Sequence, residues 1–164
     1  MFYSLLAFFA LQSNAAADYP TQTQQYKYSE QWQDNTQLKV YICDHSNNKI
    51  QNQDVLDAIN FWNKKDINVR IDKLYKTKKC ELQGKNNAIV ISDLQQEIDR
   101  NIEYGTEVTY TERQTDIIKI SYIEINTGSD VSKEIVRKAI FHEIGHSIGI
   151  KHCINCNIND LMRH

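Results

Sequence analysis

Three of the five histidines in this chain lie within an eleven-residue segment near its end. This segment reads His-Glu-Ile-Gly-His-Ser-Ile-Gly-Ile-Lys-His and runs from His142 to His152. Because His142 and His146 are four residues apart, both imidazoles leave the same face of an α-helix and can bind one metal ion. Gly149 can adopt a left-handed backbone conformation, which would end the helix and turn the chain so that His152 supplies a third nitrogen.

The residue types at this site predict catalytic chemistry. Three neutral imidazoles on a tetrahedral cation leave a fourth position for water, which is typical of a catalytic zinc rather than a structural one. Glu143 projects beside the ligands and can take a proton from that water as a general base. We therefore predict one catalytic Zn²⁺ ion held by His142, His146 and His152, with Glu143 as the catalytic residue. The alternative, a surface helix that happens to carry histidines, is disfavoured because three of the five histidines share this register.

The full pattern resembles the signature of a known clan. The spacing H-E-x-x-H-x-x-G-x-x-H, followed by Met162, resembles that of the metzincin zinc endopeptidases, which carry a methionine-containing turn after the zinc helix. A bare H-E-x-x-H arises by chance, but here Gly149, His152 and Met162 also fall in place. The resemblance implies a zinc-dependent endopeptidase that hydrolyses internal bonds of extended polypeptides. It also implies that Met162 forms a hydrophobic floor under the site without ligating zinc.

The same resemblance, which is specific only over residues 142–162, implies an α+β, zincin-like fold. A twisted mixed β-sheet, a backing helix, a central active-site helix and the Met-turn are the expected parts. Metzincins continue past the Met-turn into a further helix, whereas only Arg163 and His164 follow Met162 here. We therefore expect a minimal C-terminal subdomain, and the sequence leaves open whether this is a minimal form or a truncated copy.

Hydrophobic periodicity predicts the elements that position the motif. The expected elements are strands at 38–42, 67–71, 88–91 and 117–125 and a helix at 54–64. The run at 88–91 is continuously apolar, which favours a central strand. Residues 95–115 are polar with weak periodicity, so we expect a long loop there. The motif helix follows turn and capping residues at 126–130 and is apolar nearly all round, so we expect it to be buried.

The strand before the motif helix is a candidate substrate-binding edge. Ile123, Glu124 and Ile125 resemble part of the sheet-edge strand of matrixin-type metzincins. In those enzymes the edge strand pairs with an extended substrate through backbone hydrogen bonds. An ordinary interior strand is the alternative, and the pattern alone does not choose between the two.

The N-terminus predicts export. Residues 1–17 combine a short apolar run with Ala15, Ala16 and Ala17, which suit cleavage before Asp18. A buried N-terminal helix is the alternative, because no Lys or Arg precedes the apolar run. Residues 18–36 are rich in Gln, Thr and Tyr, so we expect an extended or poorly ordered lead-in and a catalytic domain at 37–164.

The even set of four cysteines fits disulfides in an exported protein. Cys153 directly follows the third histidine, as in archaemetzincins, and Cys156 lies in the loop leading to the methionine. A Cys153–Cys156 bridge would brace that loop. Pairing of either one with Cys43 or Cys80 remains open from the sequence. Archaemetzincins carry further cysteines for a second, structural zinc, which this chain lacks.

Charge and composition restrict the partners. The chain has 164 residues, a net charge of -2 and an isoelectric point near 6.2. These values give no global attraction to nucleic acid, and no apolar run is long enough for a membrane anchor. We expect a monomer that takes polypeptide substrates. Two other functions stay open: an inactive zinc-binding interaction module, and a structural zinc domain in which Cys153 or Cys156 completes a closed tetrahedral site. Glu143 argues against the first, because metal binding alone does not need it.

Overall fold

The computed structural model describes residues 31–43, 49–65, 69–77, 80, 86–94, 105–111, 117–152 and 161–162. Over these residues the elements follow the order β1 (Gln37–Cys43), α1 (Asn52–Asn63), β2 (Arg70–Thr77), β3 (Ala88–Leu94), β4 (Gly105–Thr111), β5 (Ile118–Asn126) and α2 (Lys133–Ser147). The predicted signal segment at 1–17 lies outside the described residues. Within them, no helix is long and apolar enough to cross a membrane.

The strands form one five-stranded mixed sheet in the order β2-β1-β3-β5-β4. β1, β2, β3 and β5 pair in parallel, whereas β4 runs antiparallel to β5. The first four residues of the middle strand, β3, are only 0–1% exposed, because apolar side chains pack against both faces of the sheet there. The expected central strand at 88–91 is therefore confirmed. β2 begins at Arg70 and continues to Thr77, further along the chain than the alternation at 67–71 predicts.

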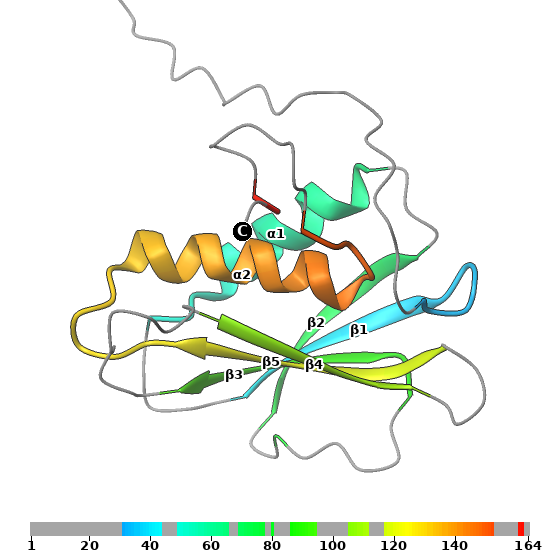
Figure 1. Ribbon diagram of the computed structural model, residues 1–164, viewed down its shortest axis with the longest axis horizontal. Helices are drawn as coiled ribbons and strands as arrows, with labels where there is room; N and C mark the ends of the chain where they lie inside the picture. Colours follow the sequence, from blue (N-terminus) through cyan, green and yellow to red (C-terminus); the bar gives the residue numbers. More distant parts are fainter. Residues whose placement is uncertain are drawn as a thin grey trace, which may run out of the picture.

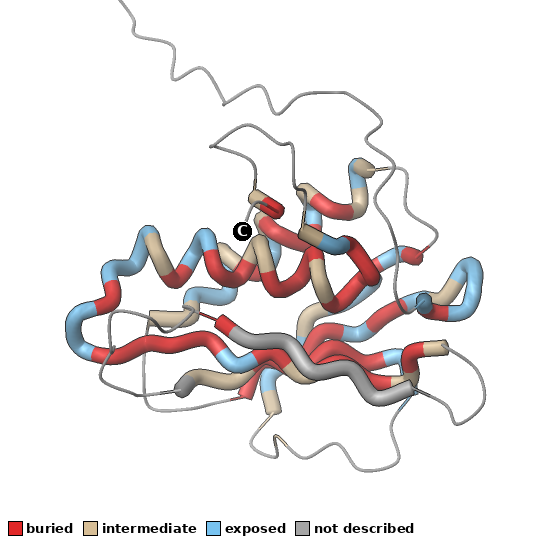
Figure 2. The backbone as a smooth tube through the Cα atoms, in the orientation of Figure 1, coloured by how far each residue is buried: buried red, intermediate tan, exposed pale blue. Residues whose placement is uncertain are grey.

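Both helices lie on the same face of the sheet (Figure 1). The apolar residues of α1 that face the core are buried at the predicted helical spacing, namely Val55, Ala58, Ile59 and Trp62. The Trp62 indole Nε1 donates a hydrogen bond to the Phe141 carbonyl oxygen at 2.8 Å, which joins α1 to α2. The first half of α2 is exposed on one side, so this helix is less uniformly buried than its apolar sequence predicts (Figure 2).

β4 corrects one sequence-based expectation. Residues 95–115 were expected to form a long loop, but Gly105–Thr111 is a strand that pairs antiparallel with β5. This strand forms by pairing with another segment of the chain, and strand propensity depends strongly on such context, so a local apolar pattern does not reveal it. The sequence of 106–111 does contain threonine, valine and tyrosine, which are residues that favour strands.

β5 corrects a second expectation, because it is an interior strand. Ile123 pairs with Ile91 of β3 on one side and with Glu107 of β4 on the other. Ile123 and Ile125 are fully buried, while Glu124 is exposed. The prediction that Ile123, Glu124 and Ile125 form the substrate-binding edge is therefore wrong, since β4 occupies that edge of the sheet.

The packed domain begins before residue 37. Gln31 forms a parallel bridge with Ile117, and its carbonyl oxygen accepts a 2.7 Å hydrogen bond from the Ile118 N–H. Trp32 is 4% exposed within the main core, and its indole Nε1 donates to the Ser147 carbonyl oxygen at 2.7 Å. Residues 31–36 therefore belong to the domain rather than to the expected lead-in at 18–36.

The Trp32 hydrogen bond leads to a stability prediction. Trp32→Phe keeps an aromatic ring in the core but leaves the Ser147 carbonyl without this donor, so we expect a loss of about 1–3 kcal/mol in the free energy of unfolding. Urea unfolding of the wild type and the variant measures this loss. Tyr75→Phe is the control, because Tyr75 is 36% exposed and its change should stay within about 0.5 kcal/mol. Equal losses in the two variants would contradict the role given to the indole.

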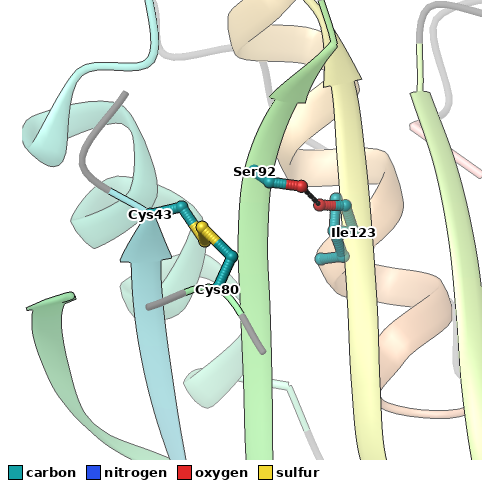
Figure 3. The surroundings of a disulfide bond; sticks show 4 residues. All are labelled: Cys43, Cys80, Ser92 and Ile123. Carbon is teal, nitrogen blue, oxygen red and sulfur yellow. Dashed lines mark hydrogen bonds between the residues drawn. A yellow bond between two sulfur atoms is a disulfide. The ribbon is translucent and has the colours of Figure 1, made fainter. Parts of the chain in front are cut away.

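One disulfide lies on the face of the sheet away from the helices. Cys43 of β1 is bonded to Cys80, with a Cα–Cα distance of 5.4 Å (Figure 3). Cys43 packs with Tyr41 and Val90 in a second apolar cluster on that face, against which Cys80 also lies. This bond excludes the expected alternatives that pair Cys43 or Cys80 with Cys153 or Cys156. The Cys153–Cys156 pairing stays a prediction, because both residues lie outside the described part of the chain.

Candidate metal centre

Helix α2 presents the metal-binding motif from a well-defined start. Ser132 is its N-cap, and the Ser132 hydroxyl accepts a 3.3 Å hydrogen bond from the Ile135 N–H. The cap thus lies two residues after the turn at 126–130 where capping was expected. Ser147, the last residue of the helix, is fully buried, and its hydroxyl lies 2.7 Å from that of Ser121 on β5. The helix is therefore fixed to the sheet directly after His146.

The chain leaves α2 through Gly149, as the sequence predicts. Gly149 has a φ of 92°, which is in the left-handed region. Its N–H donates to the His146 carbonyl oxygen at 2.7 Å, and the Ile150 N–H donates to the Gly145 carbonyl oxygen at 3.0 Å. These two bonds form a Schellman motif, which closes the helix and reverses the chain toward His152.

The three predicted histidines meet at one point. The Nε2 atoms of His142 and His146 are 2.9 Å apart, and each lies 3.0 Å from Nε2 of His152. All three side chains are partly buried, and their ring nitrogens are close enough to hold one metal ion. The convergence of His142, His146 and His152 expected from their spacing is therefore confirmed.

In His142 and His146, hydrogen bonds at Nδ1, the ring nitrogen that faces away from the cluster, fix the tautomer. The Nδ1 atom of His146 lies 2.7 Å from the Ile150 carbonyl oxygen, and Nδ1 of His142 contacts the Leu161 carbonyl oxygen. A carbonyl oxygen only accepts, so each Nδ1 carries the proton and each neutral ring presents a lone pair at Nε2. Lone pairs that face one another at 2.9 Å repel unless a cation lies between them. The donor set is therefore built for a positive ion.

The size of this set fits a small tetrahedral ion. Zinc with Zn–N distances of about 2.0–2.1 Å separates its ligand nitrogens by about 3.3–3.4 Å. The three observed separations of 2.9–3.0 Å are shorter than that by about 0.4 Å, which small side-chain rotations can supply. Two of the three imidazoles also have the carbonyl partner that metal-ligating histidines commonly have.

Glu143 is buried on the same helix as the two helical histidines. It directly follows His142 and is 5% exposed. The first residue of β4, Gly105, packs against it: a Cβ at Gly105 would lie 2.8 Å from Glu143 Cγ and 2.8 Å from Oε1. The backbone of β4 therefore restricts the space that is open to the Glu143 carboxylate.

Met162 and Leu161 both contact the motif part of α2. Met162 is fully buried in the main core. A Cβ at Gly145 would lie 2.6 Å from Met162 Sδ and 2.7 Å from Trp62 Cζ2, so both side chains press directly on the helix backbone between the two helical histidines. Leu161, the residue before Met162, supplies the carbonyl that orients His142.

Several supporting residues carry no sequence signal. Gly105, Leu161 and Ile150 contribute through backbone atoms or through a missing side chain, and no sequence pattern marks those positions. Trp32 lies far from the motif in the chain and gives only the general signal of a large apolar residue.

The left-handed conformation of Gly149 can be tested by substitution. Gly149→Ala should cost about 1–2 kcal/mol of unfolding free energy, because a Cβ is disfavoured at this φ. Zinc affinity should fall by about ten- to a hundredfold, since Gly149 positions the carbonyl that holds His146. Gly149→Asn is the matched control and should lose less, because asparagine tolerates this conformation better. Denaturant unfolding and zinc titration measure both effects. An alanine variant as stable and as tightly bound as the wild type would contradict the assignment.

Neither a scan against models of protein families nor a search of curated proteins found a match.

Proposed function

We propose that this chain is a zinc-dependent endopeptidase of the metzincin type. The observation that carries the proposal is the convergence of three imidazole Nε2 atoms within 3.0 Å of one another, with a buried glutamate on the residue after the first ligand. Neutral imidazoles in a set of three suit an ion that keeps an open position for chemistry. A structural zinc site would need a fourth protein ligand. None of the described residues joins the cluster of His142, His146 and His152, and the candidate fourth ligands Cys153 and Cys156 lie outside the described residues.

Each side chain has a distinct part in the proposed reaction. When bound, zinc would polarise the scissile carbonyl and lower the pKa of a water molecule at the site. The Glu143 carboxylate accepts the proton from the attacking water and returns it to the nitrogen of the leaving amine. The carbonyl oxygens of Leu161 and Ile150 hold His142 and His146 with Nε2 directed at the point where the three imidazoles meet. Because Glu143 is buried, bulk water has little access to the transferred proton.

β4 is the better candidate for the substrate-binding edge. It is an outer strand of the sheet, and its first residue, Gly105, lies against Glu143. The opposite edge is formed by β2, which the sheet order places four strands away. An extended polypeptide added alongside β4 would make backbone hydrogen bonds and bring a carbonyl close to Glu143. This arrangement favours cleavage within a chain, because such pairing uses backbone on both sides of the scissile bond.

Two further observations support the metzincin assignment and export. The sheet of four parallel strands with an antiparallel edge, crossed on one face by the motif helix, agrees with the mixed sheet and central active-site helix expected from the resemblance. The Cys43–Cys80 bond suits an oxidising compartment, as expected of a secreted protein.

Cleavage assays distinguish the proposed function from its alternatives. The zinc-loaded full chain is incubated with an unfolded protein and, separately, with dipeptides. We expect internal fragments of the unfolded protein and no dipeptide hydrolysis. Chelation of the metal should stop formation of these fragments. Cleavage of dipeptides alone would contradict an endopeptidase. Stoichiometric zinc without cleavage of either substrate would indicate a zinc-binding module instead.

A further inference from the structure

We propose that Gly105, the first residue of β4, is a positioning residue that sets the place of the Glu143 carboxylate. The inference rests on the proposed peptidase function, because it concerns the group that moves the proton. Gly105 and Glu143 come from different elements, 38 positions apart in the chain, and no sequence motif joins them.

The close approach involves the aliphatic part of the Glu143 side chain as well as its carboxylate. A Cβ at Gly105 would lie 2.8 Å from Glu143 Cγ, 3.1 Å from Cδ and 2.8 Å from Oε1. Carbon atoms in ordinary contact stay about 3.5–4.0 Å apart. Rotating the carboxylate end would move the oxygens but leave Cγ in place, so it cannot relieve the overlap. Any larger residue at 105 must therefore move the Glu143 side chain from Cγ to the carboxylate.

The backbone of Gly105 has little room to yield instead. Gly105 is buried and pairs with Ile125 of β5 in the antiparallel ladder, and Ile125 is fully buried. Moving Gly105 away would pull β4 from β5 at the start of the strand. Glu143 lies on the rigid helix α2, whose side chains on either side are metal ligands or core residues. We therefore expect the Glu143 side chain, and not either backbone, to move when a larger residue is placed at 105.

The reason for glycine at this position is space and not backbone conformation. Gly105 has no left-handed φ, in contrast to Gly149. An alanine at 105 therefore meets no conformational strain, and in a strand it would ordinarily be favoured over glycine. Its whole cost comes from the contact with Glu143, which makes the substitution a selective probe of that contact.

The size of the displacement predicts the effect on turnover. To reach an ordinary contact of 3.4 Å from the present 2.8 Å, Glu143 Cγ must move by about 0.6 Å. Misplacement of a catalytic group by about 1 Å can reduce turnover by about a hundredfold. We therefore expect Gly105→Ala to lower kcat by at least about tenfold, with a much smaller change in KM. Zinc affinity should be unchanged, because none of the three histidine rings is involved.

A double-mutant cycle tests the contact without relying on activity. The thermal midpoint Tm of the zinc-loaded full chain is measured for wild type, Gly105→Ala, Glu143→Ala and the double variant. Gly105→Ala should lower Tm in the wild-type background and leave it equal or higher in the Glu143→Ala background, where the side chain that it meets is gone. Gly145→Ala is the matched glycine control. A Cβ added at Gly145 would meet Met162 and Trp62 and not Glu143. Gly145→Ala should therefore lower Tm by the same amount in both backgrounds.

The two readouts separate the inference from the function on which it rests. Equal Tm shifts for Gly105→Ala in both backgrounds would overturn the contact with Glu143. A background-dependent shift combined with an unchanged kcat in an active enzyme would overturn the positioning role. A wild-type protein that binds zinc but cleaves no polypeptide would instead overturn the proposed function, while the Tm cycle would still decide the contact.

Discussion

Replacing His146 by alanine is expected to abolish stoichiometric zinc binding and, with it, peptide hydrolysis. The Nε2 atom of His146 lies 2.9 Å from that of His142 and 3.0 Å from that of His152, so the variant keeps only two ligands. Loss of a residue that merely orients a ligand costs about ten- to a hundredfold in metal affinity, so loss of the ligand itself should exceed about a hundredfold. Zinc should also stop raising Tm, because a ligand stabilises only the fold that binds it.

Zinc titration of the dialysed protein measures this effect. His45→Ala is the control, because it removes a histidine from the same chain outside the motif. It should bind one zinc per chain like the wild type. Unchanged affinity and stoichiometry in His146→Ala would refute the ligand assignment.

Replacing Glu143 by glutamine should leave zinc bound and remove catalysis. Glutamine keeps the size and polarity of the buried side chain, which is 5% exposed, but cannot accept the proton. A general base contributes about a hundred- to ten-thousandfold, so hydrolysis should fall by at least about a hundredfold. The comparison uses kcat together with zinc stoichiometry on the same preparation.

Glu134→Gln provides the matched control for that substitution. Glu134 lies on the same helix, is 76% exposed on its side chain, and pairs with Lys138 at 3.0 Å on the surface. Its kcat should equal that of the wild type, and the lost ion pair should change stability by less than about 1 kcal/mol. Near-normal turnover in Glu143→Gln would reject Glu143 as the base.

The parts of the site that follow from helical geometry were predictable from the sequence. His142 and His146 share a helix face because they are four residues apart, and Gly149 reverses the chain because glycine adopts a positive φ readily. The central strand β3 and the buried face of α1 were also predictable, since their apolar residues recur at the spacing of a strand or a helix. In each case residues that are close in the sequence determine the result.

The identity of the sheet edge was not predictable in this way. Strand order depends on which segments pair over long distances, and β4 lies before β5 in sequence yet outside it in the sheet. The apolar residues of β5 predict a strand clearly, whereas residues 105–111 do not. The sequence therefore places the predicted edge at β5. The strand that forms the edge has a weaker apolar pattern, so its pairing with β5 could not be read from the sequence.

Backbone contributions were equally hidden. The carbonyl groups of Leu161 and Ile150 orient two of the three histidine rings, yet every residue has a carbonyl, so residue type carries no information about them. Gly105 acts through the absence of a Cβ, and its effect depends on the position of a side chain from another element. Such contacts arise only when the fold brings distant segments together.

Titration of the metal-free full chain with zinc, while cleavage of an unfolded polypeptide is followed, is the most direct measurement. For a three-histidine peptidase the rate should rise in proportion to added zinc and level off at one ion per chain. Glu143→Gln should bind the same single ion without cleaving. Cleavage that proceeds at full rate before zinc is added, or saturation with zinc that produces no cleavage in the wild type, would contradict a zinc-dependent endopeptidase.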